Sequence, residues 1–444
     1  MNTPSAPPAP SSVAAAPAPS EAGAAPRCCI AGGGPAGLVL GLLLARAGVR
    51  VLVLEKHLDF LRDFRGDTVH PSTLELMHEL GLLDAFLQRP HDRVDELRVS
   101  IGGRSLPVAD FRHLPSRSKF LVLMPQWEFL DFVCDEARRH PGFTLWTDAE
   151  ATGLLQAHGR VTGVKVRRGK RGGGQPAELT VDAALVVAAD GRHSVLRDAA
   201  ALPRIGHGAP IDVLWMRIPK EPGDPEATGG HIADGRFLVT LNRGDYWQCA
   251  FVIPKGGHAD LQARGIAAFH AQVAQVAPFF AARLPSALPD WEAVKLLEVK
   301  VDRLESWSCP GLLCIGDAAH AMSPVGGVGI NLPVQDAVAA ANLLAAAPAG
   351  SASNREIDAL LPALQRRREW PVRVTQAVQR LVQDRVLKPI LDQRDQGDGS
   401  RARGPAPVPL ALRLLARWPL LRRLPARAIG SGVRPEHVRP PRAR

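Results

Sequence analysis

A glycine-rich turn between an apolar strand and a long apolar helix is the feature that most limits how this chain can fold. The strand covers residues 27–31, the turn reads GGGPAG over 32–37, and the helix pattern runs over 38–47 until a glycine stops it. A second apolar run over 49–54 predicts another buried strand, closed by Glu55. Apolar strands joined through a helix form a βαβ unit, which predicts an α/β fold built on a parallel sheet.

The turn has the spacing of a dinucleotide-binding fingerprint. Gly32, Gly34 and Gly37 make the pattern GxGxxG, in which the glycines serve the turn, the approach of a pyrophosphate and the packing of helix on strand. Glu55 lies 23 residues after Gly32, where an acid meets ribose hydroxyls. An acid rather than an arginine disfavours a phosphorylated ribose, so the adenosine of FAD or NAD is expected. The alternative is a glycine-rich turn that binds no nucleotide.

Two later segments combine a buried strand with a carboxylate at its end. The apolar run 179–189 leads into residues 190–197, DGRHSVLR, which taken alone could equally be the capped start of a helix. Residues 312–317, LLCIGD, are followed by a Pro-Gly-Gly-x-Gly turn and an Ala-rich helix that begins near Asn331. In such a unit the carboxylate can bind a polyol, and the N-terminus of the following helix can stabilise a developing anion.

The order and spacing of these three segments resemble the class A flavoprotein monooxygenases, the aromatic hydroxylases similar to p-hydroxybenzoate hydroxylase, from about residue 27 to 390. The resemblance implies that Asp317 binds the ribityl hydroxyls of FAD, that the backbone of 327–331 faces the isoalloxazine edge, and that Pro324 forms a rigid wall beside the ring. It also implies that the 190–197 segment serves both FAD and NAD(P)H.

The cofactor-binding residues expected on these grounds come from all three segments and two further positions. Arg65 and Gln126 match family positions that touch the flavin or the pyrophosphate; their alternatives are a surface salt bridge and a polar residue at a helix end. The full set is Gly32, Gly34, Pro35, Ala36, Gly37, Glu55, Lys56, Arg65, Gln126, Asp190, Gly191, Gly316, Asp317, Pro324, Gly327, Gly329, Ile330 and Asn331.

The resemblance further implies an NAD(P)H- and O2-dependent hydroxylation of an aromatic or polyketide-like small molecule through a flavin C4a-hydroperoxide. The flavin would carry that chemistry, so no catalytic side chain is assigned, and His320 is interpreted as a structural residue of its turn. The alternatives are a halogenase or reductase of the same fold and a non-catalytic FAD-binding sensor or resistance protein. A halogenase should contain a Trp-x-Trp-x-x-Pro segment, which this chain lacks.

Strands expected between residues 211 and 254 should cover the flavin and contact the substrate. By alternation the candidates are Trp215, Arg217, Tyr246, Trp247 and Gln248, with a place in the core as the alternative for each. Tyr246 is the only tyrosine of the chain, which argues against a phenol activated by several tyrosines. A larger and more apolar aromatic or polyketide-like substrate fits better.

The predicted organisation is a Rossmann-like FAD-binding domain interleaved with a mixed β-sheet substrate domain, followed by C-terminal helices. The expected boundaries are a disordered tail over 1–26; the FAD-binding domain over 27–95, 121–202 and 298–350; the substrate domain over 96–120 and 203–297; C-terminal helices over 351–395; and a basic extension over 396–444, in which 396–409 form a linker. Only one GxGxxG is present, so NAD(P)H is expected to bind transiently.

Charge and cysteine content narrow the remaining possibilities. From Ser351 onward lie 20 of the 54 Lys and Arg but only 8 of the 44 Asp and Glu, so the excess of base belongs to the C-terminal part, and a nucleic-acid partner is not expected. The basic run 411–430 could bind a membrane surface, although a helix packed on the body is favoured. No apolar run is long enough to span a membrane, and six scattered cysteines predict a reduced, cytoplasmic protein without a metal site. The oligomeric state stays open.

Overall fold

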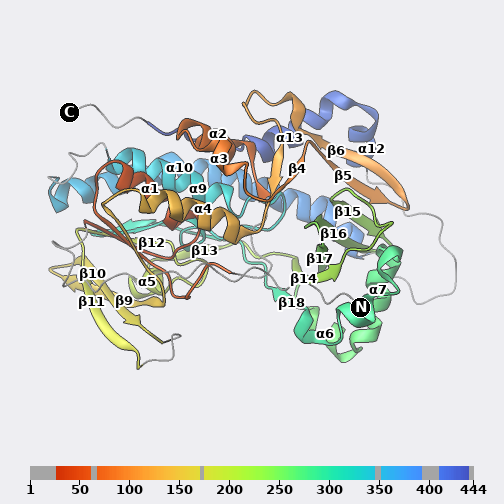
Figure 1. The fold of residues 1–444 in the computed structure, drawn as a ribbon, viewed down its shortest axis with the longest axis horizontal. Helices are drawn as coiled ribbons and strands as arrows, with labels where there is room; N and C mark the ends of the chain where they lie inside the picture. The colour runs from red at the N-terminus through yellow and green to blue at the C-terminus, as the bar shows by residue number, and fades with distance from the viewer. Residues whose placement is uncertain (1–26, 62–67, 171–174, 346–351, 393–409, 440–444) are drawn as a thin grey trace.

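A computed structural model describes residues 27–61, 68–170, 175–345, 352–392 and 410–439 of the chain (Figure 1). The predicted tail over 1–26, the predicted linker over 396–409 and Arg65 lie outside the described residues.

A six-stranded sheet forms the centre of one half of the molecule. Its order is β20 (Ser308–Cys309), β21 (Leu312–Cys314), β12 (Leu185–Ala188), β1 (Cys28–Ala31), β2 (Val51–Leu54) and β8 (Phe143–Trp146). All neighbours are parallel except β20 and β21. The four central strands are buried along their whole length, as strands covered on both faces must be.

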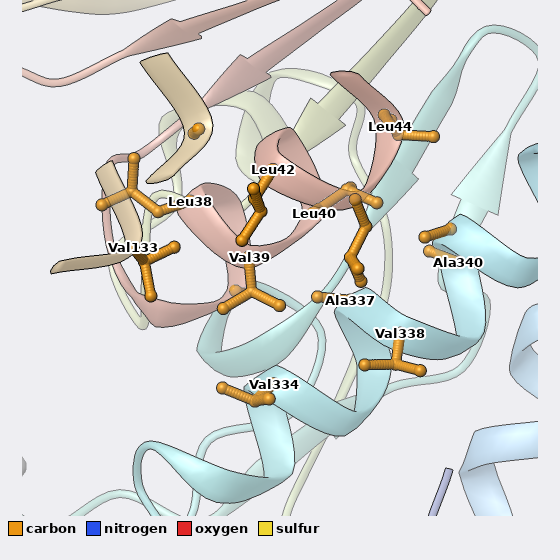
Figure 2. Packing of buried hydrophobic residues seen from close by; sticks show 14 of the residues in the cluster. Leu38, Val39, Leu40, Leu42, Leu44, Val133, Val334, Ala337, Val338 and Ala340 are labelled. Carbon is orange, nitrogen blue, oxygen red and sulfur yellow. The ribbon is translucent and has the colours of Figure 1, made fainter. Parts of the chain in front are cut away.

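Three helices cover one face of this sheet: α1 (Pro35–Arg46), α4 (Gln126–Arg138) and α9 (Asn331–Leu344). Helix α1 is buried from Ala36 to Ala45 and is apolar on every side, because it is enclosed by the sheet and the other two helices. Figure 2 shows its large side chains, such as Val39 and Leu40, directed toward small residues of α9, such as Ala337. Alanine on one helix lets leucine and valine on the other pack closely.

The opposite face carries an antiparallel sheet of β9 (Ala149–Ala157), β10 (Arg160–Arg168) and β11 (Ala177–Asp182). Inward residues such as Val164 and Val181 share a buried cluster with Leu52 of β2 and Val186 of β12. This half of the molecule is therefore built of three layers: helices, parallel sheet and antiparallel sheet.

A second sheet of seven strands lies beside the first (Figure 1). Its order is β18 (Lys295–Leu297), β14 (Ile211–Pro219), β17 (Tyr246–Pro254), β16 (Arg236–Asn242), β15 (Gly229–Ala233), β5 (Glu96–Ile101) and β6 (Arg104–Asp110). The pairing of β15 with β5 is parallel and the others are antiparallel, so the sheet is mixed. Helices α6 (His258–Ala263), α7 (Ile266–Val276) and α8 (Leu284–Ala287) lie against one face.

Smaller elements connect the two sheets. They are β3 (Thr68–Val69), α2 (Pro71–Glu79), α3 (Leu83–Phe86), β4 (Asp92–Val94), β7 (Leu121–Leu123), α5 (Val195–Ala199), β13 (Arg204–Gly206) and β19 (Asp302–Leu304). Strands β3, β7 and β4 form one small sheet, and β13 pairs with β19.

The C-terminal helices run from one sheet to the other. Helix α10 (Asn354–Val382) packs beside α9, and after a π-helical turn at Gln383–Leu387 the chain continues as α11 (Lys388–Asp392), which contacts β16 and β17. Helices α12 (Leu410–Arg417) and α13 (Arg423–Gly430) then pack on β6 (Figure 1). Their inner residues join buried clusters, although Trp418 and Leu420 are exposed. The predicted α/β class, with a Rossmann-like domain beside a mixed sheet, is confirmed.

The packing of α1 gives a stability prediction. Leu40→Ala empties a fully buried position between α1 and α9, which should cost about 2–5 kcal/mol of unfolding free energy. Denaturant unfolding measures the loss. Leu381→Ala, at a position that is 58% exposed on α10, is the control and should change stability by less than about 0.5 kcal/mol. Equal effects of the two substitutions would contradict the packing described.

Candidate cofactor and active site

The three segments singled out in the sequence meet at one edge of the parallel sheet. Ala31 of β1 pairs in register with Ala188 of β12, and Ala188 pairs with Cys314 of β21. Because the strands are parallel and end at the same level, the turns that follow them emerge side by side. Contact is direct: a Cβ added to Gly316 would lie 3.3 Å from the Cβ of Ala36 in the glycine turn.

The three glycines of the fingerprint have different surroundings. Gly32 has φ +109°, and a Cβ there would lie 2.3 Å from the carbonyl oxygen of Ala189. A Cβ on Gly37 would lie 1.9 Å from the carbonyl oxygen of Gly32, so only glycine lets α1 pack on the turn. A Cβ on Gly34 would meet nothing within 4 Å. The middle glycine therefore leaves open backbone at the N-terminus of α1, where a pyrophosphate fits.

Glu55 lies beside this turn, buried at the end of β2. Its carboxylate accepts hydrogen bonds from the backbone N–H groups of Gly33 and His57, each at 3.0 Å. The residue that the fingerprint assigns to the ribose thus also fixes the glycine turn. Lys56 is exposed, and Pro35 is the first residue of α1, where its missing N–H costs nothing.

Only one of the two carboxylate oxygens of Asp190 accepts a hydrogen bond from the described residues. Its Oδ2 accepts a hydrogen bond from the N–H of Val195 at 2.9 Å, while Oδ1 is buried and has no hydrogen-bond partner among the described residues. Burial raises the pKa of this carboxyl above its ordinary value. A buried acceptor without a donor is costly, so the carboxyl suits a ligand hydroxyl. Together with the open backbone at Gly34, it fits the nucleotide cofactor expected from the sequence.

Two arginines to which the sequence pattern assigns no role join the second and third segments. The Nη2 of Arg192 lies 3.3 Å from Oδ2 of Asp317, with both side chains half-buried. Arg197 is fully buried and donates to the carbonyl oxygens of Ala318, at 3.3 Å, and Arg192, at 3.2 Å. The signal in the sequence was the presence of basic residues within seven positions after Asp190.

Asn331 holds the end of the glycine loop that precedes α9. Its Oδ1 accepts from the N–H of His70 at 2.7 Å and from Oγ1 of Thr73 at 2.8 Å. Its Nδ2 donates to the carbonyl oxygens of Thr68, at 2.9 Å, and Gly327, at 3.3 Å. Burial lowers the pKa of His70 to about 4, so its imidazole is neutral near pH 7. The side chain of Asn331 is thus fully engaged by the protein, and only its backbone is available to a flavin.

The rest of this loop is more open. Pro324 is half-buried, Gly329 is exposed with nothing within 4 Å of an added Cβ, and Ile330 is buried. Gln126 is the half-buried first residue of α4. The roles of these residues and of Gly191 toward a cofactor stay predictions.

A buried charge network lies beneath the third segment and was missed in the sequence. Asp336 of α9 accepts from the N–H of Gly316 at 3.1 Å, lies 2.5 Å from Nε2 of His320 and accepts from Nε of Arg368 at 2.9 Å. Burial would raise the pKa of Asp336, but His320 and Arg368 hold it below its ordinary value. Arg368 lies 3.6 Å from Glu436, which binds Arg367 as well. His320, fully buried in this network, is in the structural position proposed for it.

One face of the second sheet is directed toward the glycine loop. Trp215 belongs to the same apolar cluster as Val213, Val252 and Val325, the last of which lies in the loop. Alternation puts Arg217, Tyr246 and Gln248 on this face as well. The guanidinium of Arg217 lies 4.8 Å from the ring centre of Tyr246, and Gln248 accepts from Nε of Arg243 at 3.1 Å. Nε1 of Trp215 is buried without a hydrogen-bond partner among the described residues.

Trp247 does not belong to this face, and its prediction as a substrate contact is wrong. It is fully buried under the helices on the opposite side of the sheet, 6.4 Å from the ring centre of Phe280. Its Nε1 donates to Asp224 at 2.8 Å. Neighbouring residues of a strand point to opposite faces, so Trp247 and Gln248 could not both have faced the loop.

Comparison with known proteins agrees with this site. Residues 26–377 match the family described as FAD binding domain. The chain is 34% identical to 6-methylpretetramide 4-monooxygenase of Streptomyces rimosus, over 69% of this chain and 72% of that protein. It is 28% identical to dialkyldecalin synthase of Streptomyces rugosporus, over 68% of this chain and 61% of that protein. A probable FAD-dependent monooxygenase of Pseudomonas aeruginosa has the same fold, with a TM-score of 0.67 at 18% identity over 84% of this chain and 99% of that one.

The fold and the site define an FAD-binding flavoprotein with a Rossmann-like domain. The chain belongs to the FAD-binding-domain family, with FAD as its cofactor, and it is a class A FAD-dependent monooxygenase, an oxidoreductase. Within the described ranges, no helix has both the length and the apolar character needed to cross a bilayer. The described His, Cys, Asp and Glu side chains form no group of three or more that could hold a metal ion.

The fingerprint glycines give a paired prediction. Gly37→Ala forces a Cβ against the carbonyl oxygen of Gly32 and should lower both the melting temperature and FAD retention. Gly34→Ala meets no protein atom, so it should leave the melting temperature of the apoprotein unchanged but weaken FAD binding, because its methyl group occupies the approach to the backbone. Thermal unfolding of apoprotein and fluorescence titration with FAD measure the two effects. Normal FAD affinity of Gly34→Ala would contradict the assignment.

Breaking the buried network should lower the stability of the protein, and the size of this loss should depend on pH. Asp336→Asn removes the buried carboxylate that binds Arg368 and His320, leaving Arg368 only the more distant Glu436 at 3.6 Å, and should cost about 3–5 kcal/mol at pH 7. The lowered pKa means that the wild-type carboxylate stabilises the fold above the ordinary carboxyl range and loses this effect as pH falls through the lowered pKa. The stability difference should therefore shrink in acid. Denaturant unfolding between pH 7 and pH 3, with exposed Asp384→Asn as the control, measures this.

Proposed function

We propose that this protein hydroxylates an aromatic, polyketide-like small molecule with O2 and NAD(P)H. The observation that carries the proposal is the convergence of the three segments at one sheet edge, with the Trp215 face of the second sheet directed at the same glycine loop. The relative from Streptomyces rimosus is named for a monooxygenation of 6-methylpretetramide, and it supports this class of substrate.

The residues that would hold FAD follow from their surroundings. The open backbone at Gly34 and the N-terminus of α1 would bind the pyrophosphate, with Glu55 at the adenosine ribose. The unused Oδ1 of Asp190 would accept a hydroxyl of the cofactor. Asp317, oriented by Arg192, would bind the ribityl chain, and the loop from Pro324 to Gly329 would lie along the flavin.

Bound FAD, once reduced by NAD(P)H, supplies the activation of O2. The chain's own residues orient the substrate ring and keep water away. Val213, Val252 and Val325 enclose Trp215 in an apolar cluster, which limits water at the face where the ring would lie. The N-terminus of α9 follows the loop and can stabilise negative charge on the ring system.

The polar groups on the same face suggest what the substrate carries. The buried Nε1 of Trp215 is a hydrogen-bond donor. Two cationic side chains lie nearby: Arg217 stacks on Tyr246, and Arg243 donates to Gln248. Such a set would recognise carbonyl or phenolate oxygens on an otherwise apolar ring system, which many polyketide-derived aromatics carry.

The electron donor and the location are part of the proposal. The chain has one GxGxxG, so NAD(P)H would bind transiently rather than in a second nucleotide domain. All six cysteines are free thiols, and five are buried, which is in keeping with a cytoplasmic protein.

The proposal predicts substrate-stimulated NAD(P)H oxidation with transfer of one oxygen atom. Purified FAD-loaded protein should oxidise NAD(P)H faster in the presence of a suitable polycyclic aromatic, and with ¹⁸O2 the product should gain one labelled oxygen by mass spectrometry. Asp317→Ala should purify with little FAD and show neither effect. Since a relative is named as a synthase, product without labelled oxygen from FAD-loaded wild-type protein would overturn the hydroxylase assignment.

A further inference from the structure

Three glutamines form a buried row along helix α10 and the π-helical turn that follows it. Gln376, Gln379 and Gln383 recur at the spacing of one helix face, and their side chains are 0%, 3% and 0% exposed. Burial of a primary amide is costly unless its polar atoms are bonded, and helix docking can be achieved by apolar residues. Val372 and Leu387, on the same face, show that apolar residues are used there too. The glutamines therefore call for a specific partner.

Gln379 binds the start of the glycine loop through three hydrogen bonds. The N–H of Ser323 donates to its Oε1 at 3.2 Å, and its Nε2 donates to the carbonyl oxygens of Ser323 and Val325, each at 2.8 Å. These are the two residues that flank Pro324. One amide thus fixes the backbone on both sides of the proline expected beside the flavin.

Gln383 adds a further hydrogen bond to the start of the loop. Its Nε2 donates to Oγ of Ser323 at 2.8 Å, and the same oxygen accepts from the N–H of Val325 at 3.2 Å. The helix becomes a π-helical turn at this residue, Gln383–Leu387. Such turns often occur at functional sites, since they change the direction in which side chains leave the helix.

The far end of the loop is held in the same way. Asn331 donates to the carbonyl oxygen of Gly327, so side-chain amides bind the loop at both ends. Between them Gly326 and Gly329 are exposed, and Pro324 has no N–H to bond. Thus the conformation of the exposed part depends on its two ends.

Gln376 shows what a purely structural glutamine does on the same helix. Its Nε2 also donates to two backbone carbonyl oxygens, those of Asp302 at 2.8 Å and Ala321 at 3.2 Å. Both lie before the loop. Gln376 and Gln379 are thus matched in residue type, helix and burial, and they differ in whether the bound backbone borders Pro324.

We propose that Gln379 and Gln383 are positioning residues that set the loop from Pro324 to Gly329 against the flavin, so that helix α10 controls FAD affinity and the stability of the reduced cofactor. This inference rests on the proposed role of that loop as the flavin-facing segment. An unfixed loop would leave the N-terminus of α9 less able to stabilise a negatively charged reduced ring.

The test compares Gln379→Leu with Gln376→Leu, both produced as full-length protein. Each removes a buried amide and should lower the melting temperature of the apoprotein. Only Gln379→Leu should raise the FAD dissociation constant, by about tenfold, and move the midpoint potential of bound FAD to a more negative value. Fluorescence titration and spectroelectrochemical titration measure these quantities.

Gln379→Glu keeps the acceptor for Ser323 and loses both donors, and it serves if Gln379→Leu does not fold. At neutral pH its carboxylate would face the carbonyl oxygens of Ser323 and Val325, so its FAD affinity should fall at least as far as in the leucine variant and recover at low pH, where a protonated carboxyl regains one donor. Unchanged FAD affinity and potential in both Gln379 variants, or equal changes in Gln376→Leu, would overturn the inference. Because both readouts concern FAD itself, they test it even if the wild-type enzyme transfers no oxygen, which would contradict only the proposed hydroxylation.

Discussion

The shared direction and register of β1, β12 and β21 is the constraint on which the site depends. The segments that follow these strands are separated by more than one hundred residues in the chain, yet each emerges beside the next because parallel neighbours end at the same edge. The approach is close enough that Gly32 can carry no side chain against Ala189. A strand shifted by one residue would exchange the side chains on its two buried faces and separate the turns.

Polar side chains in the core hold the loops in place, as apolar packing holds the helices. The turns around the site have little apolar surface, so they cannot be held by burial alone. Asp336 holds Gly316, Asn331 holds Gly327, and Gln379 holds Ser323, each through hydrogen bonds made away from water. A satisfied buried network is directional, which lets it select one backbone conformation where apolar contacts would accept several.

The βαβ unit could be predicted because its signals are local, whereas the mixed sheet and the meeting of the three segments were implied by the resemblance to a known family. Glycine spacing, apolar runs and strand-end carboxylates each report on a few adjacent residues. Alternation divides β17 into two sets of residues, but it cannot say which set meets the helices; Trp247 lies under the helices, and the role of Gln248 stays a prediction.

The supporting residues could not be found in this way, because their partners are distant in the chain. In the sequence, Asp336 and Gln379 look like ordinary polar residues of helices. Their roles become visible only in the fold, where Asp336 binds Gly316 and Gln379 binds Ser323. A faint signal existed: polar residues at Gln376, Gln379 and Gln383 recur with the same spacing as the apolar face they interrupt. Periodicity identifies a buried face, but hydrogen-bond partners require the fold.

The position of Glu436 has a consequence for the order in which contacts of the fold are completed. Its carboxylate binds Arg367 and lies against Arg368, which in turn binds the Asp336 that holds Gly316. This charge network spans the chain from the third segment almost to the last described residue. During synthesis on the ribosome the network stays incomplete until Glu436 has emerged from the exit tunnel. The support of Gly316 beside the site is therefore complete only after the chain has been made as far as Glu436.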